Sequence, residues 1–124
     1  MPCPYTSSTG IRCMFYLSEG TEFFFSDKFE GAQAMQWLFF EQYSHEPFIA
    51  TFRFCYLTGK AQEYREALKQ KQAPGYDALG VMEQHLANHA FFTGDRYTIA
   101  DIGLFAYTHF AGESGFDLTK VPAI

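Results

Sequence analysis

The sequence contains no cluster of positive charge, and this absence limits the partners that the chain can bind. Its 124 residues include nine Lys and Arg against 14 Asp and Glu, which leaves a formal net charge of −5. Proteins that bind nucleic acids or anionic membrane surfaces usually present a basic patch. We therefore expect neither a nucleic acid nor a membrane among the partners.

Cysteine is scarce and long apolar runs are absent. The three cysteines, Cys3, Cys13 and Cys55, show neither paired nor metal-type spacing. An odd number of cysteines without a secretory signal is typical of a reducing cytoplasm. The longest apolar runs, such as residues 37–40, are far shorter than the roughly 20 residues of a membrane-spanning helix. We expect a cytoplasmic protein in which Cys55 is a small buried apolar residue.

Aromatic side chains, in contrast, are abundant: the chain has 15 Phe, 8 Tyr and one Trp. Such side chains bury a large area each, and they also line sites for apolar ligands. Two interpretations stay open at this point, a core rich in phenylalanine and an apolar binding site. The length is that of one domain, large enough to bury a core of its own.

The spacing of apolar residues predicts helices and no strand, so the fold class is all-α. We expect little stable structure in residues 1–9 and a short helix over residues 11–18. Asp27 and Glu30 form a capping pair, which predicts the start of a long helix near residue 28.

Proline and glycine divide the middle of the chain. Pro47 removes a backbone donor, so it should kink the long helix near residues 43–46, and Thr58-Gly59 should end that helix. The next helix should begin near residue 60 and be interrupted or kinked at Pro74-Gly75. Beyond that point a buried stripe is predicted at Leu79, Met82, Leu86 and Ala90.

The stretch before the last long helix carries the clearest local signal. Thr98 can cap a helix with its hydroxyl group, and Asp101, three residues later, can accept a hydrogen bond from the backbone of the cap residue. The helix that follows, to about Phe110, is apolar on almost every face, which is typical of a central helix. Residues 118–124 are expected to begin a further helix.

Four blocks in this order resemble the glutathione S-transferase family, specifically its C-terminal helical domain. The resemblance covers about residues 10–124. The blocks are residues 34–47, residues 79–86, Phe92-Thr93-Gly94-Asp95 with Thr98-Ile99-Ala100-Asp101, and residues 116–118 with 121–124.

The resemblance implies a division of the chain into two parts. Residues 1–25 would be a disordered start plus the last helix of a thioredoxin-like domain that is otherwise missing. Residues 26–124 would be the C-terminal helical bundle, truncated at its end. The family opens that last thioredoxin-domain helix with Glu-Ser or Asp-Ser, which holds glutathione. Thr9 and Gly10 stand at the matching positions, so the charged anchor is lost.

The activity implied by the resemblance is conjugation of the glutathione thiol to hydrophobic electrophiles. Glutathione would be a co-substrate, no other cofactor is expected, and a homodimer is possible within the family. The chain keeps mainly the electrophile-binding domain, so no catalytic residue is assigned. Two alternatives stay open: a non-catalytic helical module that binds an apolar ligand or a protein, and an inactive gene fragment.

His45 is the candidate for a position close to glutathione. It precedes Pro47 within the predicted kink, where a side chain can turn toward a cleft. In similar bacterial family members a histidine of the corresponding helix lies beside the glutathione sulfur, where an imidazole can stabilise a thiolate. The alternative is a partly exposed helix histidine without a task.

The remaining candidates are weighed against structural roles. Asp101 and Thr98 are assigned to capping and not to catalysis. His85 and His89 lie four residues apart, but no third ligand is in view, so no metal site is predicted. The candidates for the apolar substrate pocket, with plain packing as the alternative, are Tyr43, Phe48, Phe105 and His109.

Overall fold

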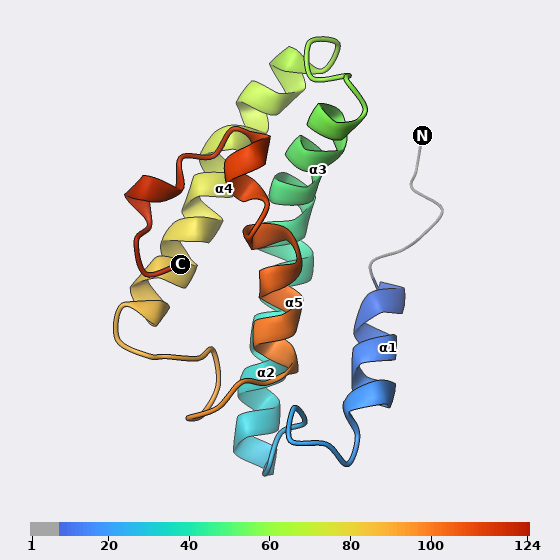
Figure 1. The fold of residues 1–124 in the computed structure, drawn as a ribbon, viewed down its shortest axis with the longest axis vertical. Helices are drawn as coiled ribbons and strands as arrows, with labels where there is room; N and C mark the ends of the chain where they lie inside the picture. Colours follow the sequence, from blue (N-terminus) through green and yellow to red (C-terminus); the bar gives the residue numbers. More distant parts are fainter. Residues whose placement is uncertain (1–7) are drawn as a thin grey trace.

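The computed structural model describes residues 8–124, and over these residues it is helical without a strand, which confirms the all-α fold class. The π-helical segment η1 joins α2 to α3, and two 3₁₀ turns follow α5 (Figure 1). The elements are α1 (Ser8–Ser18), α2 (Lys28–Phe40), η1 (Glu41–His45), α3 (Glu46–Leu57), α4 (Arg65–Leu86), α5 (Ile99–Thr108), η2 (Ala111–Ser114) and η3 (Leu118–Lys120).

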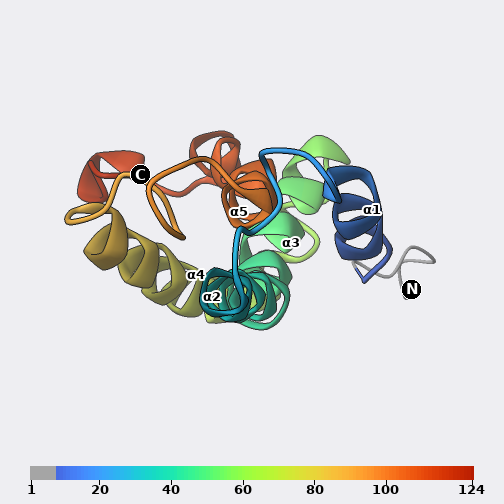
Figure 2. The same cartoon turned by 90° about the horizontal axis from the view of Figure 1, so that it is seen from below.

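The helices are arranged around one long rod. Helix α2, η1 and α3 follow one another in a single continuous column, and α4 returns antiparallel beside α3 (Figure 1). Helix α5 packs against α2, α3 and η1, and α1 lies on the far side of α5 from α4 (Figure 2). This arrangement makes α5 the element that connects α1 to the rest of the molecule.

The core is mainly aliphatic, so the expectation of a core rich in phenylalanine holds only in part. Among the 15 phenylalanines, three are fully buried, Phe52, Phe92 and Phe116. The others are half-buried or exposed, which leaves several aromatic rings at the surface. The aliphatic and small core residues include Ala34, Leu38, Ile49, Leu68, Leu79, Met82, Ile99, Ala100, Leu104 and Ala111.

The predicted helix start near residue 28 is confirmed, and the predicted kink takes a specific form. Asp27 accepts hydrogen bonds from the backbone N–H groups of Phe29 and Glu30, at 2.8 and 2.9 Å. Ahead of Pro47 the chain forms the π-helical turn η1. Proline has no N–H to donate and crowds the preceding turn, and a wider turn relieves both constraints.

The first and fourth helices differ from the expectation at their starts. Helix α1 already begins at Ser8, whereas residues 1–7 lie outside the described part, so the expectation for them is not addressed. Helix α4 begins at Arg65 and not near residue 60, because the chain leaves α3 through Gly59 (φ 68°) and turns before the helix starts. The predicted stop at Thr58-Gly59 is confirmed.

Helix α4 runs through Pro74 without interruption, so of the two expected outcomes, an interruption or a kink, the interruption is wrong. Leu68 and Leu79, on either side of the proline, are buried and anchor both halves of the helix in the core. The buried stripe ends at Met82, since Leu86 is only half-buried and Ala90 is exposed beyond the helix. The helix expected over residues 118–124 is reduced to the single 3₁₀ turn η3.

The start of α5 forms the predicted capping box. Thr98 accepts a hydrogen bond from the N–H of Ala100, and Asp101 Oδ2 accepts from the backbone N–H of Thr98 at 2.8 Å. The other carboxylate oxygen, Oδ1, accepts from the N–H of Phe92 at 3.0 Å. Thr98 and Asp101 therefore have the structural role assigned to them, and Asp101 also holds the loop before the helix.

We expect Asp101→Ala to lower the free energy of unfolding by about 3 kcal/mol, because buried N–H donors lose their charged acceptor. Asp27→Ala removes an exposed cap and should cost only about 1 kcal/mol. Urea denaturation of both variants measures the difference. Equal losses would contradict the central role of the Asp101 carboxylate.

Two glycines of α4 give a second test. A β-carbon on Gly75 would lie 2.6 Å from the Phe116 ring, whereas one on Gly80 would meet no atom within 4 Å. Gly75→Ala should therefore destabilise by about 2 kcal/mol through overpacking. Gly80→Ala should stabilise by up to about 1 kcal/mol through helix propensity. Thermal unfolding measures both, and a shift of the same sign in the two variants would refute this packing.

Candidate functional site

His45 lies in the core where η1 meets α5. Its side chain is 0% exposed, and its Nε2 is 2.8 Å from the hydroxyl of Thr108. The Thr108 hydroxyl donates its own hydrogen to the carbonyl of Leu104, at 2.6 Å. His45 must therefore donate from Nε2, which leaves Nδ1 as an acceptor without a partner among residues 8–124.

This position corrects the expectation that His45 turns toward a cleft. A side chain that is fully buried in this chain alone cannot become more accessible when another domain packs on it. Burial lowers the pKa of His45 to about 4, so the imidazole is neutral near pH 7. The geometry assigns His45 to the core, where its side chain has no exposed surface in this conformation.

A second buried ionisable group lies one turn earlier in η1. Glu41 is buried, and burial raises the pKa of its carboxyl group to about 7, with the nearby charge of Glu46 adding to the effect. Gln42 donates a hydrogen bond to the carboxyl group and partly opposes this rise. The junction of α2 and α3 thus holds an acid and a base whose neutral forms are favoured.

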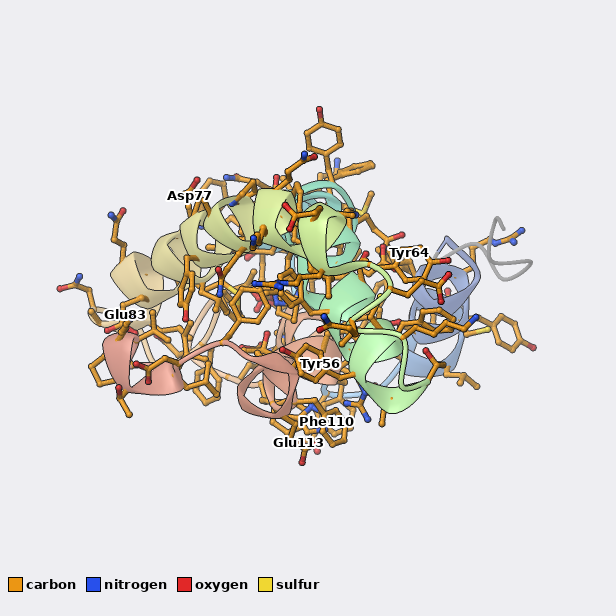
Figure 3. All side chains as sticks on the ribbon, turned by 90° about the horizontal axis from the view of Figure 1, so that it is seen from above. Tyr56, Tyr64, Asp77, Glu83, Phe110 and Glu113 are labelled. Atoms are coloured by element: carbon orange, nitrogen blue, oxygen red, sulfur yellow. The ribbon has the colours of Figure 1, made fainter. Side chains whose placement is uncertain are left out.

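Two of the four pocket candidates lie together at the end of α5. The rings of Phe105 and His109 are stacked, with centroids 4.4 Å apart and planes 7° apart. His109 also contacts Phe110, and the guanidinium of Arg53 lies over the Phe110 ring at 3.1 Å from its centroid. We call Phe105, His109, Phe110 and Arg53 the aromatic ladder; Figure 3 labels Phe110 and, on α3, Tyr56.

The other two candidates are elsewhere. Tyr43 is 85% exposed and projects from η1 into solvent, so it encloses no pocket. Phe48 is half-buried on α3, with the ammonium group of Lys71 5.7 Å from its ring centroid. The four residues therefore do not form one pocket. The i,i+4 spacing of Phe105 and His109 was the useful signal, because it is the spacing that stacks rings on a helix.

The structure also contains a hollow that the sequence did not indicate. It has a volume of about 310 Å³ and opens between the end of α4, α5 and the last residues of the chain. Phe105 borders it from α5, and Ile124 borders it from the chain end. Asp101, Phe105 and Thr108 share one face of α5, whereas Gly103, the contact point of α1, lies on the opposite face. The hollow and α1 are thus on different sides of α5.

His85 in α4 and His89 just beyond its end do not direct their nitrogens toward one metal ion. The rings of His85 and His89 are stacked 4.3 Å apart with planes 9° apart, so their nitrogen lone pairs do not converge. His85 Nε2 donates a hydrogen bond to the carbonyl of Phe91, at 3.0 Å. Within residues 8–124 no group of three ligating side chains is found, and no helix there is long and apolar enough to cross a membrane.

The family model of the glutathione S-transferase C-terminal domain matches residues 20–124. The chain belongs to the glutathione S-transferase family. No curated protein matches it. Among solved structures, a glutathione S-transferase from Xanthobacter autotrophicus is 41% identical, with a TM-score of 0.88, over 91% of this chain and 56% of that one.

Two further crystal structures support the same assignment. A glutathione S-transferase from Pseudomonas fluorescens is 45% identical, with a TM-score of 0.86, over 90% of this chain and 56% of that one. A possible glutathione S-transferase from Rhodopseudomonas palustris is 38% identical, with a TM-score of 0.86, over 96% and 54% of the two chains. This family member therefore spans little more than half the length of these relatives.

We expect the two buried groups of this family member to give opposite pH dependences. His45 has an ordinary pKa of 6.5 and a native pKa of about 4, so its contribution to stability rises with pH between these values. Glu41 has an ordinary pKa of 4.5 and a native pKa of about 7, so its contribution to stability falls as the pH rises between these two values. Each amounts to about 3 kcal/mol, and they oppose each other between about pH 4.5 and 6.5.

Urea denaturation at several pH values separates the two contributions. In His45→Gln, stability should fall as the pH rises from 4.5 toward 7, relative to the parent protein. In Glu41→Gln, it should rise from about pH 4 toward 6.5. Parallel curves for the two variants would contradict the burial of these groups in their neutral forms.

Proposed function

We propose that this chain is the helical half of a glutathione S-transferase that conjugates glutathione to hydrophobic electrophiles. The observation that carries the proposal is the match of residues 20–124 to the family's C-terminal domain, together with about 40% identity to three relatives. On this proposal α1 is the last helix of the thioredoxin-like, glutathione-binding domain, and residues 26–124 form the electrophile side.

The aromatic ladder is the part of the chain that suits the electrophile. Phe105 is 57% exposed, and its ring continues into those of His109 and Phe110. An exposed aromatic surface stabilises a planar apolar substrate by stacking and keeps water from its reacting carbon. With a chlorinated nitrobenzene, the glutathione thiolate forms a sulfur–carbon bond and chloride leaves. The thiol proton passes to solvent through the glutathione-binding domain.

The setting follows from the same family membership. The net charge of −5 and the reduced state expected of its cysteines fit a cytoplasmic protein involved in detoxification. Glutathione and a small hydrophobic electrophile are the proposed partners, and a homodimer is the proposed assembly. His45 does not contact glutathione in this proposal. Its hydrogen bond to Thr108 stabilises the contact between η1 and α5, the helix that carries Phe105.

One observation favours a second candidate function, a non-catalytic binding module. Several large apolar side chains are strongly exposed on α1 and α2, which is typical of surfaces that another protein or domain covers. These residues are Tyr16, Leu17, Phe29 and Phe39. Such a module would bind an apolar ligand or a protein without turnover.

The test compares this chain alone with the same chain joined to the preceding part of the Pseudomonas fluorescens relative. We expect glutathione-affinity retention and conjugation of chlorodinitrobenzene from the joined protein, and neither from the chain alone. In the joined protein, Phe105→Ala should raise the KM for the electrophile about tenfold through lost apolar contact. Tyr43→Ala is the matched control and should leave it unchanged. A folded joined protein without turnover would favour the binding module.

A further inference from the structure

The guanidinium group of Arg96 connects segments that are far apart in the sequence. Its Nη1 donates to the carbonyl of Glu22, and its Nη2 donates to the carbonyl of Phe24 at 2.7 Å. Nη2 also donates to the carboxylate of Glu30 at 2.9 Å. Arg96 lies in the loop before α5, and residues 19–27 are the linker between α1 and α2. One side chain thus holds the linker, the start of α2 and the start of α5 together.

The acceptor side of this contact is equally well defined. Glu30 is buried, and the carboxylate oxygen that binds Arg96 also accepts hydrogen bonds from the backbone and the hydroxyl of Ser26. Gly94 has φ of 56°, and a β-carbon there would lie 2.7 Å from the other carboxylate oxygen. A glycine is required at this position for both reasons. We call Arg96, Glu30, Ser26 and Gly94 the linker clamp.

Helix α1 also contacts α5 of the helical domain directly. Ser18, its last residue, is its only buried side chain among those described. Met14 packs toward Gly103 of α5. Phe15 meets the rings of Phe24 and Phe25 at 5.9 and 6.1 Å.

The contacts of Phe15 make α1 dependent on the linker. Phe24 and Phe25 are linker residues, so much of the packing of α1 is against the segment that Arg96 holds. A guanidinium is suited to this task because its donors form a rigid planar fork, whereas a lysine ammonium is a single point. The linker clamp therefore holds the linker, and the linker in turn holds the end of α1. The hydroxyl of Thr21 in the linker donates a hydrogen bond to the carbonyl of Ser18 in α1, at 2.7 Å.

We propose that Arg96 is a positioning residue that fixes the direction in which α1 leaves the helical domain. The inference rests on the proposed function in one respect: if α1 belongs to the glutathione-binding domain, the clamp orients that domain relative to the aromatic ladder. Figure 2 shows the linker passing between α1 and α2 beside the loop that leads into α5. The clamp acts on geometry and does not touch a substrate.

The experiment measures the position of α1 directly and needs no glutathione. Trp37 on α2 is the only tryptophan, and Cys13 is an exposed thiol on α1. A dye on Cys13 accepts energy from Trp37, with Cys3→Ser in every protein and Cys55 protected by burial. The donor lifetime distribution reports how narrowly α1 is held.

Arg96→Gln should broaden this distribution by about twofold, because an element released from a fixed contact samples several orientations. Arg53→Gln is the matched control: it removes a half-buried arginine from the Phe110 ring, away from the linker, and should leave the distribution unchanged. Arg96→Lys and Glu30→Gln keep part of the clamp and should give intermediate widths.

Circular dichroism verifies that each variant is folded. An unchanged distribution in folded Arg96→Gln would overturn the proposal. The other contacts of α1 and its linker, among them the packing of Met14 and Phe15 and the hydrogen bond from the N–H of Ile99 to the carbonyl of Phe23, would then suffice to hold α1. If that variant does not fold, unchanged widths in both Arg96→Lys and Glu30→Gln would overturn it in the same way. Equal broadening in Arg53→Gln would also count against it, because the effect would then be general loosening. None of these outcomes depends on conjugation activity, so the two proposals fail separately.

Discussion

The Asp101 carboxylate is the constraint on which the arrangement of the helices depends. It accepts hydrogen bonds from the backbone of Thr98 and Phe92 and from the hydroxyl of Thr98, all of them buried. Helix α5 has ten residues, a length at which an isolated helix is unstable in water. Because α5 is the common neighbour of α1, α2, α3 and η1, the capping group that starts it also fixes where those elements meet.

Two ionisable groups near this meeting point are buried, and burial favours their neutral forms. The hydrogen bond from His45 to Thr108 joins η1 to α5, and Glu41 lies one turn away along η1. Burial without a countercharge favours the uncharged state of both groups, which is the less costly way to place an acid and a base in a core. The exposed rings of the proposed electrophile site, in contrast, lie at the surface, on the aromatic ladder.

Local signals in the sequence predicted local structure well and long-range structure poorly. The caps at Asp27 and Thr98 and the stop at Gly59 depend on neighbouring residues, and all three were predicted. The start of α4 and its continuity through Pro74 were not. The turn after Gly59 delays the start, and the buried residues on both sides of Pro74 outweigh its local preference. His45 is a further case. Pro47 led to the prediction of an open kink beside it, whereas α5 packs on this turn and His45 is buried.

The sequence by itself determined the capped helix starts at Asp27 and Thr98, the fold class and the family, since these depend on capping, periodicity and ordered blocks of residues close together in the chain. Only the tertiary structure decided what His45, Arg96 and Phe105 do. The partners of His45 and Arg96 are 63 to 74 residues away in the sequence, and no local pattern specifies such pairs. Whether a ring such as Phe105 is core or surface likewise depends on which helix covers it. That is a property of the assembled bundle.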